Sequence, residues 1–336
     1  MNMILKSRIL NYGRLKRSLF LYLLFLFYHI ASVMCFYNSR ITILSRDSNG
    51  FLFQASENFE FDEFGWTTPD GIEISMLSCK GKYTLSNHKQ SPILFLHGSF
   101  HSAWCYREHF MPYFSSCGYD CFAMSLRGTK ASALSADVTS VRIEEHVGDV
   151  SFVLDQIFRD SRQRPIVVAH SFGGLLLMKI LERPEMRDVI SAAIFLCSIP
   201  PSGNGAMTKR FLAKSPLLSL KIVWGFVLRG VTTNADLCRE LFFDSQLTAE
   251  LLTQYMAHFK EDSKVVVDFA ALSGVLPSRT SMRTDGSAAW LPPPPTTTDV
   301  ATTTADYGST TILFCVAFPI IGTRNNTYLY YMYVCT

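Results

Sequence analysis

Strand-like runs alternate with amphipathic stretches through the middle of the chain. Residues 71–77 alternate between apolar and polar side chains, as a strand with one exposed face does. Residues 140–158 carry apolar side chains at helical spacing. Further runs of strand length, most of them nearly all apolar, follow one another at 92–96, 119–124, 165–169 and 192–197. This alternation predicts an α/β fold with a mostly parallel sheet and helices on both faces.

The pattern changes after the last of these strands. Residues 199–269 are helical, irregular and rich in aromatic side chains, which predicts a helical cap inserted after the sixth strand. We therefore expect one domain over residues 60–277 that includes this cap.

The composition shifts again after Pro277. The prolines and threonines of residues 291–311 exclude a helix or a central strand there. Two later runs, 311–318 and 328–333, are β-prone and nearly uncharged but have no predicted pairing partner. Residues 278–336 are therefore expected to be an aberrant Pro- and Thr-rich tail that is disordered.

The first 46 residues resemble a targeting segment. Residues 19–37 form a nearly unbroken apolar run that is long enough to span a bilayer. The pattern favours a signal sequence or membrane anchor, and hence a membrane-associated or secretory protein. A plastid or other organellar transit peptide and a mistranslated upstream extension remain alternatives. No acidic residue precedes Asp47, whereas seven basic residues do: Lys6, Arg8, Arg14, Lys16, Arg17, Arg40 and Arg46.

Charge and cysteine content argue against two classes of protein. Removing those seven basic residues from the 31 in the chain leaves 24 against 28 acidic residues, so the body is mildly acidic and gives no support to nucleic-acid binding. The nine cysteines are odd in number, and Cys117 and Cys121 have no second Cys or His pair at zinc-ligand spacing. We expect no metal, no cofactor and no nucleic-acid partner.

The strongest chemical signal is Ser171. It lies between the apolar run 165–169 and a helical stretch, with Ala169 two residues before it and Gly173 two residues after it. Small residues at these positions permit a sharp strand-to-helix turn that exposes a nucleophilic serine. The N–H group of Phe172, at the start of the helix, would then stabilise an oxyanion.

A second motif, His97-Gly98-Ser99-Phe100, also follows a buried strand. Together the two motifs resemble the α/β-hydrolase family of the AB hydrolase-1 type. Within that family the chain is similar to plant esterase- and lipase-like enzymes with a His-Gly-x-x-His-x-x-Trp stretch, here residues 97–104. The resemblance covers residues 60–275, and a serine at the turn argues against epoxide hydrolase or dehalogenase chemistry, which uses a carboxylate nucleophile.

The resemblance implies a role for each motif residue. Ser171 would be the nucleophile, and the second oxyanion N–H would come from Ser99 or Phe100. A substrate with a small hydrophobic ester or a lipid-like acyl bond would fit beneath an aromatic cap. The oxyanion loop and the turn would be shaped by His97, Gly98 and Gly173. His97 is expected to be a structural hydrogen bonder, and His101 and Trp104 to be pocket wall or core.

The proton relay has no counterpart in the sequence. In this family the acid follows the seventh strand and the histidine follows the eighth. No histidine follows His258, which falls in the predicted cap, and Asp285, Asp299 and Asp306 lie in the tail. We therefore expect the last two strands to be missing. The residues after about Pro277 would replace them, as a retained intron or a wrong reading frame would, and the chain would be a truncated form of a working hydrolase. If the chain is real as written, the sixth strand is expected to be an open sheet edge and the protein to be inactive. A non-catalytic ligand-binding protein of the same fold is the alternative.

Overall fold

A computed structural model describes residues 59–82, 90–199, 212–213, 215–243, 247–267, 276, 311–319 and 328–335. The predicted targeting segment and residues 277–310 lie outside these ranges. Among the helices that the structure does describe, none is long and apolar enough to cross a bilayer.

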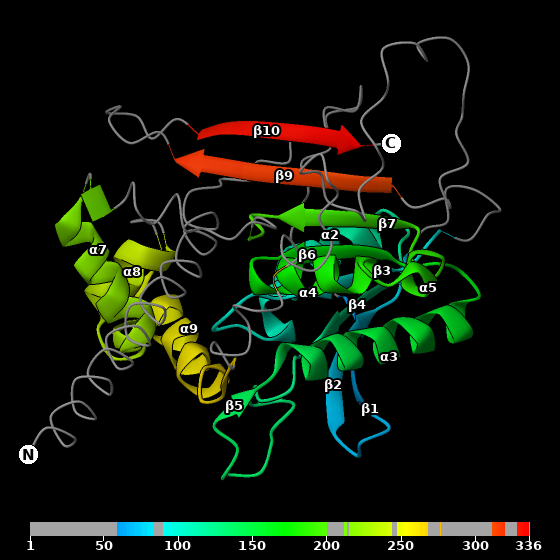
Figure 1. The fold of residues 1–336 in the computed structure, drawn as a ribbon, viewed down its shortest axis with the longest axis horizontal. Coiled ribbons are helices and arrows are strands. Elements are labelled where there is room, and N and C mark those ends of the chain that lie inside the picture. Colours follow the sequence, from blue (N-terminus) through cyan, green and yellow to red (C-terminus); the bar gives the residue numbers. More distant parts are fainter. Residues whose placement is uncertain are drawn as a thin grey trace, which may run out of the picture.

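A single eight-stranded sheet forms the centre of the fold (Figure 1). The strand order is β1-β2-β4-β3-β6-β7-β9-β10. β2 is antiparallel to both β1 and β4, while β4, β3, β6 and β7 run parallel to one another. The α/β fold class with a mostly parallel sheet is therefore confirmed. The strands are β1 (Asp62–Thr67), β2 (Glu73–Cys79), β3 (Ile93–Leu96), β4 (Cys121–Met124), β6 (Ile166–His170), β7 (Ala192–Leu196), β9 (Thr311–Pro319) and β10 (Tyr328–Cys335).

The structure corrects the prediction for the end of the sheet. β9 pairs in parallel with β7, and β10 pairs antiparallel with β9. The prediction that the last two strands are missing and that the sixth strand is an open edge is therefore wrong, as is the prediction of disorder for residues 311–319 and 328–335. The physical reason is that the unpaired N–H and C=O groups along β7 form a template for any β-prone segment that reaches them.

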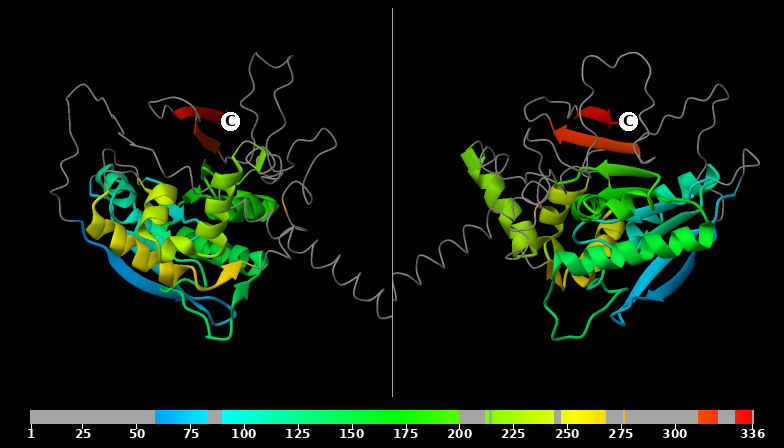
Figure 2. Two further views of the ribbon diagram at one scale, coloured as in Figure 1. Left: turned by 90° about the vertical axis from the view of Figure 1, so that its left-hand side faces the viewer. Right: turned by 45° about the vertical axis from the view of Figure 1, so that its right-hand side comes forward.

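Helices cover both faces of the sheet (Figures 1 and 2). Side chains alternate along each strand, so Leu94 and Leu96 of β3 pack with α3 and α4, whereas Ile93 and Phe95 pack with η1 and α2. All four are at most 2% exposed. These helices are η1 (Ala103–Tyr106), α2 (Phe110–Ser116), α3 (Ile143–Ser161), α4 (Phe172–Leu181) and the short α5 (Pro184–Arg187).

A group of helices lies at one end of the domain, in the stretch of sequence where a cap was expected (Figure 1). It has its own aromatic cluster, in which Phe226, Phe242 and Phe259 pack around Phe100 of the loop that follows β3. The cap elements are α7 (Pro216–Ile222), a π-helical turn η2 (Val223–Val227), η3 (Gly230–Thr232), α8 (Ala235–Phe242) and α9 (Ala249–Asp262). A two-stranded ladder, β5 (Ser140–Val141) with β8 (Val266–Val267), returns the chain to the domain.

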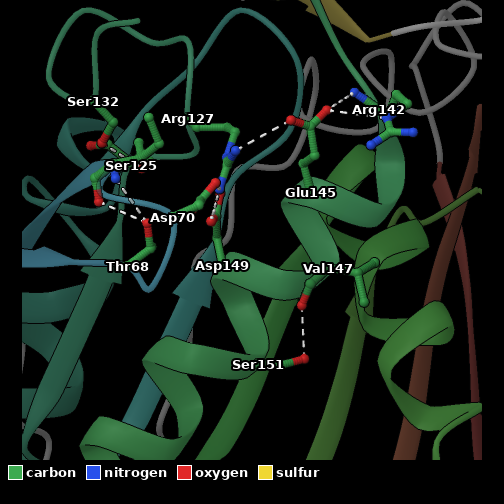
Figure 3. Close-up of polar contacts among 11 residues, drawn as sticks. Thr68, Asp70, Ser125, Arg127, Ser132, Arg142, Glu145, Val147, Asp149 and Ser151 are labelled. Carbon is green, nitrogen blue, oxygen red and sulfur yellow. Dashed lines mark hydrogen bonds and ion pairs between the residues drawn. The ribbon is translucent and has the colours of Figure 1, made fainter.

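A buried ion pair fastens the turn after β4 to α3 (Figure 3). The Arg127 guanidinium donates to both carboxylate oxygens of Asp149, and it lies 3.0 Å from a carboxylate oxygen of Asp70. Arg127 and Asp149 are 5% and 1% exposed at their side chains. The carboxylates of Asp149 and Asp70 raise the pKa of Arg127 above its usual range, so the guanidinium stays charged.

Candidate active site

Ser171 lies in a strained turn between β6 and α4. Its backbone dihedrals are φ 54° and ψ −114°, a conformation that is costly for a residue with a side chain. The N–H group of Ser171 donates to the carbonyl oxygen of Leu196 on the neighbouring strand, at 3.2 Å. The serine therefore belongs to neither the strand nor the helix, as the sharp-turn hypothesis requires.

The Ser171 hydroxyl is buried and unpartnered within the described part of the chain. The residue is 0% exposed, and its Oγ has no hydrogen-bond partner there. Buried hydroxyls normally have a partner, and strained backbone conformations cluster at functional sites. A strained serine with an unpaired hydroxyl is therefore a candidate for chemistry.

Two glycines bring the loop after β3 against this turn. A Cβ on Gly98 would lie 2.8 Å from the Cβ of Ser171. A Cβ on Gly173 would lie 2.7 Å from the carbonyl oxygens of Leu96 and His97. Both distances are too short for a side chain, so the loop and the turn approach as closely as two glycines allow. The two sequence motifs therefore lie against each other.

The candidate oxyanion donors flank this contact. Phe172 is the first residue of α4, where backbone N–H groups point out of the helix towards the turn. Ser99 and Phe100 continue the loop from Gly98, and Phe100 has φ 68°, a second strained non-glycine residue. The backbone is thus arranged with two sets of N–H groups near Ser171, and the assignment of Phe172 and Ser99 to an oxyanion hole remains a prediction.

His97 has a structural environment. Its Nε2 accepts from the N–H group of Leu126 at 2.9 Å, and its Nδ1 lies 2.7 Å from the carbonyl oxygen of Gly98. These partners fix a neutral tautomer in which Nδ1–H donates and Nε2 accepts. Burial lowers the pKa of His97 to about 4. Both ring nitrogens are occupied, as expected of a residue that shapes the loop.

Asp262 is the important residue that sequence reasoning missed. It is 6% exposed at the end of α9, and its carboxylate accepts from three donors on two other loops. Oδ2 accepts from the Ser102 hydroxyl at 3.0 Å and from the Trp104 indole at 2.8 Å, while Oδ1 accepts from the Lys130 N–H group at 3.0 Å. Asp262 thereby ties the cap to the His-Gly-x-x-His-x-x-Trp loop. No local signal marks it, because Lys-Glu-Asp-Ser-Lys reads as a solvated helix end.

The remaining histidines of the site region sit around the loop and the cap. The His101 Nδ1 lies 2.8 Å from the Ser99 carbonyl oxygen, and the ring stacks on Trp104, which in turn stacks on His258. This matches the expectation that His101 and Trp104 are wall or core. His258 lies on α9 in the cap, as predicted.

His146 is a further buried histidine, on α3. Its ring meets Phe172 edge-on at 5.5 Å, and its Nδ1 has no hydrogen-bond partner among the described residues. Burial, with smaller contributions from the charges of Arg127 and His97, lowers the pKa of His146 to about 3. His146 is therefore neutral near pH 7.

The direction of β10 bears on the proton relay that the sequence was expected to lack. β6 and β9 run parallel to β7, so the carboxyl ends of all three strands lie at the end of the sheet where Ser171 is located. β10 is antiparallel, and its last residue, Cys335, pairs with Ile312 near the start of β9. The carboxyl end of β10 therefore lies at the opposite end of the sheet from Ser171. Within the described ranges no cluster of three or more His, Cys, Asp or Glu side chains could hold a metal ion.

Comparison with known proteins gives one family. The model of the Alpha/beta hydrolase family matches residues 93–323, which is more than half of the chain and extends past Pro277 into β9. No curated protein matches.

Three solved structures illustrate the distance to characterised relatives. Epoxide hydrolase VrEH1 from Vigna radiata is 20% identical, with 65% of this chain and 72% of that chain covered and a TM-score of 0.41. An alpha/beta hydrolase from Novosphingobium aromaticivorans is 17% identical, with 61% of this chain and 65% of that chain covered and a TM-score of 0.40. The esterase EaEST from Exiguobacterium antarcticum is 14% identical, with 63% of this chain and 72% of that chain covered and a TM-score of 0.40. These likenesses are too distant to carry an argument about chemistry.

Proposed function

Because the chain belongs to the α/β-hydrolase family, we propose that Ser171 is the nucleophile of a site for ester hydrolysis. The supporting observation is the strained turn at φ 54°, with a buried hydroxyl that has no partner in the described part of the chain. The substrate class is a small hydrophobic ester or a lipid-like acyl bond, because the loop beside Ser171 packs through Phe100 into an aromatic cap.

The chemistry would proceed through a seryl acyl-enzyme. The Ser171 oxygen attacks the ester carbonyl, its proton leaves to a base, and the carbonyl oxygen becomes an oxyanion. The N–H groups of Phe172 and of Ser99 or Phe100 are the candidate donors to that oxyanion. Loss of one such donor typically slows acyl transfer by about a hundredfold or more. The alcohol then departs and water hydrolyses the acyl-enzyme.

We further propose that this chain turns over weakly or not at all. A serine hydroxyl is a poor nucleophile without a base, and residues 259–336 contain no histidine. His97 is engaged at both nitrogens, and His258 stacks on Trp104 in the cap. The chain would then have the nucleophile Ser171 and the candidate oxyanion donors but lack the general base and its acid partner.

Two labelling experiments test these statements separately. A fluorophosphonate probe labels a serine that a base activates, so we expect the chain to label no more than its Ser171→Ala variant. Strong labelling that Ser171→Ala abolishes would support the nucleophile and contradict the loss of the base.

The second experiment removes the need for a base. A thiol is nucleophilic through its thiolate, which the start of a helix stabilises. Ser171→Cys, treated with p-nitrophenyl butyrate, should gain one butyryl group on the peptide that contains position 171, with little turnover. Ser115→Cys on α2, equally buried but at the opposite end of the sheet from the turn, is the control. Acylation of both variants alike, or of neither, would contradict the placement of Ser171 as nucleophile.

The alternative function is ligand binding without catalysis. It is favoured by the same unpartnered Ser171 hydroxyl, which a bound carbonyl oxygen could satisfy. A non-hydrolysable butyryl ketone should then raise the unfolding temperature of the chain, and Ser171→Ala should reduce that rise. An unchanged unfolding temperature at saturating ketone would exclude this alternative.

A further inference from the structure

The outer side of α7 and η2 presents an apolar face to solvent. Its members recur at i, i+3, i+7 and i+11, which places them on one side of a continuous helical segment. Its three leucines are more exposed than any other large apolar side chain in the described part of the chain. The face consists of Leu217, Leu220, Trp224 and Leu228, which are 77%, 65%, 46% and 70% exposed.

The inner side of the same segment is already committed to the cap. Ile222 and Phe226 are 0% and 5% exposed and pack in the cap cluster. The segment is therefore apolar on both sides, which is typical of a helix with a second apolar environment beside it. α7 lies at the outer edge of the cap, away from α3 and the sheet (Figures 1 and 2).

The charge of the sequence that contains this segment indicates which apolar environment it meets. From Val189 to Ala235 the sequence contains five basic residues and no acidic residue; the basic residues are Lys209, Arg210, Lys214, Lys221 and Arg229. On the neighbouring α8, Glu240 pairs with Lys221 at 2.7 Å, and Asp236 lies in the first turn. A helical segment with an exposed Leu and Trp face, in a stretch of sequence with five basic residues and no acidic residue, has the composition of helices that lie in the interface of anionic membranes.

We propose that the α7 face docks on the surface of an anionic phospholipid bilayer. The three leucines would enter the boundary between headgroups and acyl chains, where the helix axis lies parallel to the surface. Trp224 would sit at headgroup depth, as tryptophan does at membrane interfaces. Removing these side chains from water supplies the apolar part of the binding energy, and the basic excess supplies attraction to the anionic headgroups. The proposal does not depend on the chemistry of Ser171.

The test must report on the α7 face itself, because the N-terminal apolar run could also hold the full chain on vesicles. The fluorescence of Trp224 is isolated as the difference between the chain and its Trp224→Phe variant. Vesicles of phosphatidylcholine, with and without phosphatidylserine, carry bromine on their acyl chains and quench indoles that reach them. We expect the Trp224 signal to be quenched on the vesicles with phosphatidylserine. The quenching should weaken without phosphatidylserine, and also at about 1 M salt, where the Debye length falls to about 3 Å.

Surface variants give the matched comparison. Leu217→Gln/Leu220→Gln/Leu228→Gln should lose the quenching of Trp224, whereas Leu251→Gln, at a position 37% exposed on α9, should keep it. Trp224 that stays unquenched while the chain sediments with vesicles would overturn the proposal. Protection of Trp224 from quenching by iodide in the absence of vesicles would also overturn it. Such protection would mean that a second copy of the chain, detected as a doubled mass in solution, or another segment of the same chain covers the face.

Discussion

Gly98 and Gly173 lie where two backbone segments approach more closely than a Cβ permits. At Gly173 the obstruction is the backbone of β3 and its following loop, since the carbonyl oxygens of Leu96 and His97 would lie 2.7 Å from an added Cβ. Backbone carbonyls at the end of a central strand cannot move aside as the tip of a flexible side chain can. The turn at Ser171 therefore depends on the absence of a side chain at Gly173.

Gly173→Ala should therefore destabilise the protein although alanine favours helices. Overpacking of this kind costs about 1–3 kcal/mol. The control is Gly148→Ala on α3, where nothing lies within 4 Å of the added Cβ and the helix should gain about 0.5–1 kcal/mol. Urea unfolding of both variants gives the comparison, and a Gly173→Ala protein as stable as the parent would contradict the close packing at this turn.

His146 is a second residue whose environment makes a measurable prediction. Burial lowers its folded-state pKa to about 3 from an ordinary value of 6.5. Between these values the unfolded chain binds a proton that the folded chain excludes. The free energy of unfolding contributed by neutral His146 is thus fully present above pH 6.5 and is lost as the pH falls towards about 3.

His146→Leu should flatten the loss of stability in acid. Below pH 6.5 the difference between parent and variant should change by at most about 1.4 kcal/mol per pH unit, in favour of the variant. Some acid sensitivity should persist, because burial also lowers the pKa values of His97 and His101. Urea unfolding from pH 7 to pH 4 measures the slopes, and parallel curves for parent and variant would show that burial does not lower the pKa of His146 in the folded protein.

At the scale of elements, the Arg127–Asp149 pair joins the turn after β4 to the first part of α3 (Figure 3). Both side chains are buried, and without Asp149 the buried Arg127 would keep, among the described residues, only the exposed carboxylates of Asp70 and Glu145 beside it. Arg142 and Glu145, by contrast, form an exposed pair at the start of the same helix, with side chains 66% and 37% exposed. Exposed pairs contribute little.

Asp149→Leu should cost about 3–5 kcal/mol in the free energy of unfolding, because Arg127 would remain buried and charged. Arg127→Met/Asp149→Leu should recover most of that loss, since neither charge is left. Arg142→Ala, the exposed control, should cost at most about 1 kcal/mol. Guanidinium unfolding of the three variants measures these values. A double variant as unstable as Asp149→Leu alone would mean that α3 loses packing instead of charge compensation.

Most of the sheet and the turn at Ser171 could be predicted from sequence because they depend on local signals. The apolar runs at 92–96 and 165–169 identify buried strands, and the small residues around Ser171 identify the turn. Asp149 could also have been noticed, because it lies on the apolar side of a helix between Val147 and Val150. Asp262 could not, because its donors lie more than 130 positions away in the sequence. Long-range polar contacts of this kind leave no periodic pattern.

At the scale of the whole molecule, the sequence misleads most at the end of the sheet. The runs that become β9 and β10 were expected to lack partners because the prolines and threonines before them interrupt the alternation of strands and helices. Strand pairing depends on proximity in space, and the edge of β7 accepts β9 whatever the composition of the connection between them. The direction of β10 relative to β9 also cannot be predicted from the sequence, although it decides at which end of the sheet the carboxyl end of β10 lies.

A single proline in β9 tests whether the sheet continues beyond β7. β9 lies between β7 and β10, so its backbone N–H groups face ladders on both sides. Phe314→Pro removes one N–H from this interior strand, which proline disrupts strongly. Hydrogen exchange should then speed up at the amides of residues 192–196 and 328–335, while β1, β2 and β3 at the far side of the sheet keep their protection. Phe314→Val, which retains the N–H and the β propensity, is the control and should leave exchange nearly unchanged. If Phe314→Pro leaves the amides of β7 as protected as in the parent, the sheet ends at β7 in solution, and the extension through β9 and β10 is absent.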